Sequence, residues 1–162
     1  MKRKSFETMQ CSVAQSLEVI GEWWTPLILR DLMMGVSRYE EMQERLGIAR
    51  NILVARLAHL EEAGVVEKVP YQAHPKRNDY RLTAKGRDLW LVIEAMREWG
   101  DRWAAPGGPP IEIVHRSCGE LTHVVPTCAH CGEVLEYGEL RMIEGPGAGD
   151  HGLLPTRSHP AS

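Results

Sequence analysis

The residues of this chain best suited to chemistry are cysteines and histidines that gather in one short C-terminal segment. Three of the four cysteines, Cys118, Cys128 and Cys131, lie there, and His115 stands three residues before the first of them. The resulting H-x2-C and C-x2-C pairs each place two ligands on one tight turn, a spacing typical of zinc sites. Because four nitrogen or thiolate ligands close a tetrahedral Zn²⁺ site, these residues predict structural zinc.

Two alternatives stay open for this cluster. His123 and His130 are alternative fourth ligands in place of His115. Cys128 and Cys131 also have a spacing that suits a reversible disulfide, which makes redox sensing the competing interpretation. A metal- or thiol-dependent oxidoreductase or sensor that uses this cluster is therefore the alternative function.

Other enzyme chemistry finds no support in the sequence. No paired carboxylate, Ser-His-Asp set or phosphate-binding loop is visible, and no predicted strand precedes the C-x2-C pair as it would in a thioredoxin-like unit. We therefore expect a protein that is not an enzyme.

The composition is that of an ordinary globular protein, 43% hydrophobic and 25% charged. The formal net charge of −3 is unevenly distributed, since residues 1–105 sum to +1 and residues 106–162 to −4. A near-neutral main segment is compatible with DNA binding, which depends on where the basic side chains gather. No stretch approaches the roughly 20 apolar residues of a membrane span, and no signal peptide is visible, so we expect a cytoplasmic protein.

Turn-forming stretches divide the chain into four parts. We predict a main domain over residues 1–104, a linker over 105–110, a small zinc-ribbon-like module over 111–144 and a disordered tail over 145–162. Within the module we expect short strands at 111–114 and 134–137. No internal repeat is evident.

The element around which the main domain is organised is a helix predicted over residues 49–63. Its apolar stripe is Leu53, Leu57 and Leu60, and the polar residues that fall largely away from the stripe are Arg50, Asn51, Arg56 and His59. Gly64 is placed where a helix needs a left-handed residue to end. A preceding helix over 39–46 and a turn through Gly47 complete a helix-turn-helix pattern.

Two further helices are expected before this unit. The periodicity predicts one over residues 8–20. Thr25 and Pro26 are typical of the cap and first turn of a second, which should be the most buried helix because it is apolar around much of its circumference. Ser37 and Glu40 have the spacing of a capping box at the start of the third helix.

After residue 64 the pattern changes from helical to extended. Runs at 65–71 and 79–82 predict a β-hairpin whose connection carries the basic Lys76 and Arg77, a tip that suits contact with DNA phosphates. Thr83 can cap one long helix that continues to about Trp103. Its apolar stripe is Leu89, Ile93, Met96, Trp99 or Gly100, and Trp103. Two such helices from two subunits would bury each other's stripes, which predicts a two-fold homodimer.

In this order and spacing the sequence resembles the HxlR-type transcriptional regulators of bacteria, winged-helix proteins related to the MarR group. The likeness rests on Cys11–Ala14, Trp24–Leu32, Arg56-Leu57, Leu60–Gly64 and Tyr71–Gly86, within residues 9–103. It implies a mainly α fold with a small β-hairpin wing. It also implies a homodimer that binds a pseudo-palindromic operator in double-stranded DNA, regulates transcription of nearby genes and can respond to a small-molecule effector. Some members of the family carry similar cysteine-bearing tails.

The resemblance makes the helix over 49–63 the recognition helix. The candidate DNA contacts are Ser37, Arg38, Arg50, Asn51, Arg56, His59, Lys76 and Arg77. Ala49 departs from the family, which usually has Ser there, so the helix start should lose about 1 kcal/mol of capping unless another group anchors it. In some similar regulators a cysteine at the position of Cys11 senses electrophiles or disulfide stress, which makes Cys11 a candidate redox sensor; a buried cysteine without a signalling role is the alternative.

Overall fold

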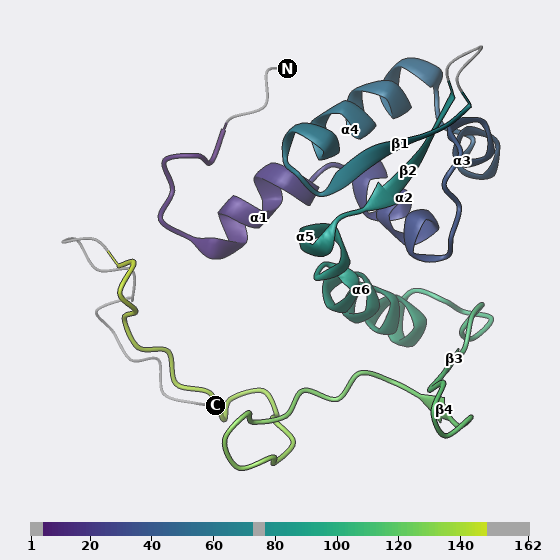
Figure 1. Cartoon of the computed structure of the whole chain (residues 1–162). Helices are drawn as coiled ribbons and strands as arrows, with labels where there is room; N and C mark the ends of the chain where they lie inside the picture. The colour runs from purple at the N-terminus through teal and green to yellow at the C-terminus, as the bar shows by residue number, and fades with distance from the viewer. Residues whose placement is uncertain (1–4, 73–76, 149–162) are drawn as a thin grey trace. The chain divides into compact units, whose positions relative to one another are not determined.

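The protein is described by a computed structural model that covers residues 5–72 and 77–148. Its elements (Figure 1) are α1 (Ser12–Ile20), α2 (Trp24–Met33), α3 (Tyr39–Leu46), α4 (Arg50–Glu62), β1 (Val66–Gln72), β2 (Arg77–Leu82), α5 (Ala84–Arg87), α6 (Trp90–Trp103), β3 (Ile113–Val114) and β4 (Leu121–Thr122). The chain divides into two compact units, one spanning Ser16–Ile111 and the other comprising the remaining N-terminal and C-terminal residues. Within the described residues, no helix has both the length and the apolar character that a membrane span requires.

Helix α2 supplies the centre of the core, as its apolar sequence predicts. Ile28 and Leu29 are fully buried. The predicted stripe of α4 joins the same core, with Leu53, Leu57 and Leu60 no more than 1% exposed. Burial of a leucine side chain contributes about 2 kcal/mol, so three leucines at helical spacing set firmly which face of α4 points inward.

A buried carboxylate ties α2 to α3. Asp31 of α2 is fully buried, and its Oδ1 accepts a hydrogen bond from Arg30 Nη2 at 2.7 Å. Its Oδ2 accepts one from Arg45 Nε of α3 at 3.3 Å. The two guanidinium groups compensate a charge that would otherwise be costly to bury.

The predicted hairpin is formed by β1 and β2, which pair antiparallel from Val66 opposite Leu82 to Pro70 opposite Asn78. Figure 1 shows it running beside α4, where β1 and α4 are in contact. Strand β2 begins at Arg77, earlier than predicted. The hairpin is the wing that the sequence analysis anticipated.

A third segment joins the wing, and the sequence analysis missed it. Arg38 forms a β-bridge with Asp79, and the Tyr80 N–H donates to the Ser37 carbonyl at 2.8 Å. The start of α3 is therefore attached to β2, which couples the wing to the helix-turn-helix.

Two predicted helix caps are wrong. Thr25 lies inside α2, which begins at Trp24, and its Oγ1 is buried without a hydrogen-bond partner in the described residues. The capping box of Ser37 and Glu40 does not form, since α3 has Arg38 as its N-cap and no side-chain cap. Ser37 stands one residue too early because the chain is still extended there, paired with the wing.

The single long helix predicted after Thr83 is also wrong, because two helices form. Thr83 caps only the short α5, since the Gly86 N–H donates to the Thr83 Oγ1 at 3.1 Å. A turn at Asp88 and Leu89 then separates α5 from α6. A Cβ on Gly86 would lie 2.1 Å from the Val65 carbonyl oxygen, so α5 packs closely against the chain that follows α4.

In the C-terminal unit, β3 and β4 pair antiparallel over two residues each. Strand β3 lies within the segment predicted at 111–114. The strand predicted at 134–137 does not form. Val134 makes a single β-bridge, to Thr127, and the Leu135 N–H donates to the Pro126 carbonyl at 2.9 Å. None of the residues 112–148 is buried.

Candidate nucleic-acid interface

Helix α4 presents one face to solvent, opposite its buried leucines. The exposed positions of this face, spaced i, i+1, i+4, i+5 and i+8, are Arg50, Asn51, Val54, Ala55 and Ala58. Its polar side chains stand at the N-terminal end, and small or apolar ones follow. An arginine can bind a guanine edge and an asparagine an adenine edge, while small apolar side chains can contact thymine methyl groups.

Arg50 and Asn51 on this face were predicted DNA contacts, whereas Ala55 and Ala58 were not. Ala55 lies four residues after Asn51, and Ala58 lies eight residues after Arg50. This helical spacing could have placed both alanines on the same face as the two polar residues.

Two other predicted contacts, Arg56 and His59, lie on the flank of α4. Both are half-buried. His59 Nε2 lies 3.0 Å from the Glu18 carbonyl oxygen, and Arg56 Nη1 lies 3.9 Å from Glu22 Oε1. In this structure both side chains therefore hold α4 to the segment that runs from α1 to α2.

The start of α4 is anchored without a side-chain cap. Ala49 is the N-cap, with φ −62° and ψ 138° and no side-chain hydrogen bond. Two other features position it, namely Gly47 at φ 62° in the turn from α3 and Ile48, which is only 3% exposed. Tyr39 Oη also donates to the Arg50 carbonyl at 3.1 Å. The start of α4 is thus held by tertiary contacts of Ile48 and Tyr39, in place of the serine cap that is usual in the family.

Basic side chains of the wing are exposed near its two strands. Arg77 begins β2, and Arg38 lies with its guanidinium carbon 5.2 Å from the centroid of the Tyr71 ring. Lys76 lies outside the described residues. A hydrogen bond from Lys68 to Glu61 raises the pKa of the lysine. The Lys68 charge is thus already paired with a carboxylate of the protein.

The pattern of the HxlR-like helix-turn-helix family matches residues 19–107. The chain belongs to the HxlR family. Among its relatives, the uncharacterised HTH-type transcriptional regulator Rv3095 of Mycobacterium tuberculosis is 43% identical over 137 residues, which is 84% of this chain and 87% of that protein. The HTH-type transcriptional regulator YodB of Bacillus subtilis is 33% identical over 101 residues, 62% of this chain and 90% of YodB.

Solved structures also resemble this HxlR protein. The crystal structure of PA1607, a candidate transcription factor, has a TM-score of 0.78 and 36% identity, and the match covers 88% of this chain and 100% of PA1607. The redox regulator HypR in its oxidised form has a TM-score of 0.53 and 31% identity over 57% of this chain and 96% of HypR. The match to Rv3095 is long enough to extend beyond residue 107 into the cysteine segment.

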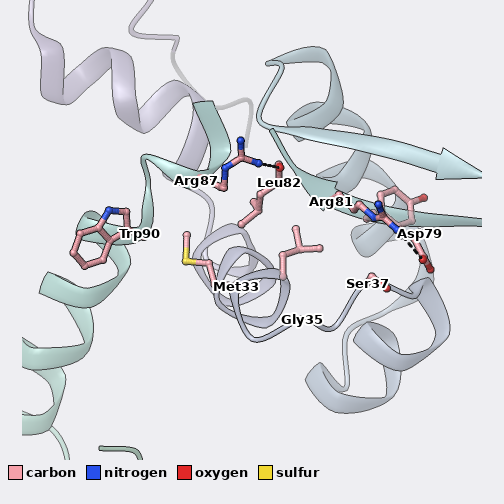
Figure 2. Close-up of a pocket in the computed structure, with 10 residues that line it drawn as sticks. Met33, Gly35, Ser37, Asp79, Arg81, Leu82, Arg87 and Trp90 are labelled. Carbon is pink, nitrogen blue, oxygen red and sulfur yellow. Dashed lines mark hydrogen bonds and ion pairs between the residues drawn. The ribbon is translucent and has the colours of Figure 1, made fainter. Parts of the chain in front are cut away.

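The compact unit Ser16–Ile111 contains a pocket of about 700 Å³ between the end of α2, strand β2 and the start of α6 (Figure 2). Its apolar lining includes Met33, Leu82 and Trp90, and its polar lining includes Asp79, Arg81 and Arg87. Arg87 Nη1 donates to the Leu82 carbonyl at 3.0 Å, and Arg81 Nη2 lies 4.0 Å from Asp79 Oδ2. A molecule in this pocket would touch both the wing and α6.

Cys11 precedes the first helix. Helix α1 begins at Ser12, so the start predicted at residue 8 is wrong. Local turns replace the first predicted turn of helix, since the Met9 N–H donates to the Phe6 carbonyl at 2.8 Å and the Cys11 N–H to the Met9 carbonyl at 2.8 Å. The Cys11 thiol is free and exposed; its role as a redox sensor stays a prediction.

The predicted metal ligands come together as two pairs. We call the segment His115–Glu120 the first knuckle and Cys128–Glu133 the second. In the first knuckle, Cys118 Sγ lies 3.3 Å from His115 Nδ1. In the second, hydrogen bonds from the backbone N–H groups of Cys131 and His130 lower the pKa of the Cys128 thiol. Within residues 5–72 and 77–148, no three His, Cys, Asp or Glu side chains form one metal-binding group, so the two pairs stay apart.

Proposed function

We propose that this chain is a transcriptional regulator that binds a pseudo-palindromic DNA operator as a homodimer. In this proposal α4 enters the major groove and the β1–β2 wing contacts the flanking backbone. The observation that carries it is the single exposed face of α4, held outward by fully buried leucines on the other side. Family membership supports it, since relatives such as Rv3095 and YodB are named transcriptional regulators.

Arg50 and Asn51 are the base-reading residues of this proposal. They stand at the N-terminal end of α4, the end from which recognition helices contact base edges. The small side chains behind them, at Val54, Ala55 and Ala58, let the helix backbone approach the groove closely. Arg56 and His59 then position α4, because their polar atoms already face Glu22 and Glu18.

The wing supplies the sequence-independent part of the affinity. Arg38 and Arg77 are exposed and offer positive charge to the DNA backbone. Lys76, for which the sequence predicts the same role, lies outside the described residues. Phosphate contacts of this kind release counterions, so operator affinity should fall steeply with salt. Ser37 contributes through its backbone, which holds Tyr80 of β2.

Helix α6 is the proposed dimer contact. Ile93 packs into the protomer's own core, but Met96 and Trp99 are 52% and 65% exposed. Leu91 and Val92 adjoin them along one shallow apolar groove. A second copy would cover this groove by two-fold symmetry and present two α4 helices at once. Half-sites about 34 Å apart, one turn of DNA, are then expected.

The pocket of Figure 2 is the proposed site for a small-molecule effector. Met33 and Trp90 offer an apolar surface, and Arg81 and Arg87 offer positive charge, a combination suited to an aromatic carboxylate. Because β2 and α6 both line the pocket, occupancy would be communicated to the wing and the dimer contact. Benzoate is a simple probe: it should raise the melting temperature of the wild type and do so much less for Arg81→Gln, whereas an equal effect on both would contradict this site.

The test of the proposed function is a footprint on the DNA upstream of the chain's own gene, at stated salt. The wild type should protect two half-sites. Arg50→Ala with Asn51→Ala should weaken operator binding at least about 30-fold, since each lost bidentate base contact costs about 1–3 kcal/mol. Arg141→Ala, which removes an exposed arginine from the C-terminal unit, is the matched charge control and should bind normally. Unchanged affinity and sequence preference in the folded double variant would overturn the proposal.

A further inference from the structure

The C-terminal unit builds the same turn twice, thirteen residues apart along the chain. In the first knuckle the His115 N–H donates to the Glu120 carbonyl at 2.9 Å and the Gly119 N–H to the His115 carbonyl at 2.8 Å. The equivalent bonds of the second knuckle join Cys128 to Glu133 and Gly132 to Cys128, both at 2.8 Å. The two glycines have φ of 77° and 78°.

The strand pairing that flanks each knuckle repeats in the same register. Val114 pairs with Leu121 around the first knuckle, and Thr127 pairs with Val134 around the second. Each partner of one pair is thirteen residues from its counterpart in the other. The sequence hides this repeat, because the two knuckles share only Cys, Gly and Glu at successive positions.

This duplicated structure has no apolar core of its own. Among residues 112–148, which are all described, none is buried, and Leu121 and Val134 are 63% and 57% exposed. A short two-stranded hairpin is at best marginally stable in water without such a core. Two hairpins that each end in a pair of metal-ligating side chains indicate that cohesion comes from a bound ion.

We propose that the two knuckles together bind one structural zinc ion through His115, Cys118, Cys128 and Cys131. Each knuckle is half of the site, already turned so that its two donors lie on one side of a tight turn. The pairs are separate in this structure, so metal binding brings the halves together and orders the unit. Binding consumes one Zn²⁺ and releases the three thiol protons to solvent, with no redox change.

The repeat also selects the fourth ligand among the three histidines. His115 occupies the position that Cys128 occupies in the second knuckle, and its Nδ1 lies 3.3 Å from Cys118 Sγ. His123 falls outside both knuckles. His130 lies between two ligand positions of the second knuckle and contributes its backbone N–H to the Cys128 sulfur. Four protein ligands leave no open position, so the site is structural.

Metal analysis of the full chain, purified under reducing conditions, tests this proposal. One zinc per chain is expected. After removal with a chelator, titration with Co²⁺ should give the tetrahedral d–d bands and the thiolate charge-transfer band of a three-sulfur site. Cys131→Ser should abolish these bands, and His115→Ala should weaken Co²⁺ binding more than about tenfold.

The matched controls are His123→Ala, His130→Ala and Cys11→Ser, each of which should bind Co²⁺ like the wild type. Failure to bind one metal ion per chain would overturn the proposal. Loss of Co²⁺ binding in His123→Ala or His130→Ala, with His115→Ala binding like the wild type, would overturn His115 as the fourth ligand. Because metal content is measured without DNA, the result is independent of the operator experiment, and Arg50→Ala with Asn51→Ala should retain its zinc.

Discussion

Ala49 shows at the scale of one residue how tertiary contacts replace a local signal. It occupies the N-cap of α4 with an extended backbone, and no side chain caps the helix. Tyr39 instead anchors the first turn through the Arg50 carbonyl. The Ile52 N–H donates only to the Ala49 carbonyl, at 3.0 Å, and no side chain at the N-cap accepts a hydrogen bond from the first turn, so a conventional cap can still be added.

Ala49→Ser should therefore stabilise the protein by about 1 kcal/mol, because the hydroxyl can accept a hydrogen bond from an N–H of the first turn. Urea unfolding without DNA measures this effect. Ala58→Ser, an exposed change in the middle of α4, is the control and should be neutral or slightly destabilising. Equal effects of the two substitutions would contradict the capping argument.

Gly86 is a second residue whose role is steric. A Cβ at this position would lie 2.1 Å from the Val65 carbonyl oxygen. Gly86→Ala should destabilise the fold by about 2–3 kcal/mol, since backbone must move to admit the methyl group. Gly107→Ala, with no atom within 4 Å of the new Cβ, should leave the urea midpoint nearly unchanged. A small effect at Gly86 would show that α5 can shift freely.

At the scale of elements, α2 is joined to the first helix of the helix-turn-helix by charge as well as by apolar packing. Asp31 carries a fully buried carboxylate between α2 and α3, while Arg30 and Arg45 are partly exposed. Loss of the carboxylate would free two side chains that water can solvate. Loss of both arginines would leave the buried charge alone, which is the more costly change.

Arg30→Ala with Arg45→Ala should therefore cost about 3–5 kcal/mol in unfolding free energy. Adding Asp31→Asn to this double variant should recover part of the loss, because it removes the uncompensated charge. Chemical denaturation of the double and triple variants measures the difference. A triple variant less stable than the double one would show that the carboxylate is not the source of the cost.

The whole molecule is proposed to work as a symmetric pair, since one α4 helix reads only half an operator. The exposed groove of α6 is the surface available for pairing. Met96 and Trp99 of this groove are 52% and 65% exposed, whereas Ile93 on the same helix is 8% exposed and packs in the core.

Met96→Glu with Trp99→Glu should convert the proposed dimer to monomer, because four carboxylates would face each other across the two-fold axis. Sedimentation velocity measures the mass. Met34→Glu, at a comparably exposed methionine that follows α2, should stay dimeric. The monomer should also lose cooperative protection of the two half-sites. A double variant that stays dimeric would show that α6 is not the dimer interface.

The sequence alone determined the elements whose cause is local. The leucine spacing of α4 and the left-handed Gly64 at its end depend on neighbouring residues, and both formed as predicted. The hairpin also formed, although β2 begins two residues earlier than predicted. The family likeness likewise followed from the order of these elements.

Tertiary structure decided what depends on contacts between distant segments. Arg56 and His59 turned toward Glu22 and Glu18, and the helix predicted after Thr83 divided in two. The repeated register of the knuckles likewise became visible only in space. The physical reason is that periodicity specifies which face of an element is apolar, whereas steric fit and hydrogen bonding between elements choose the partner of each remaining side chain.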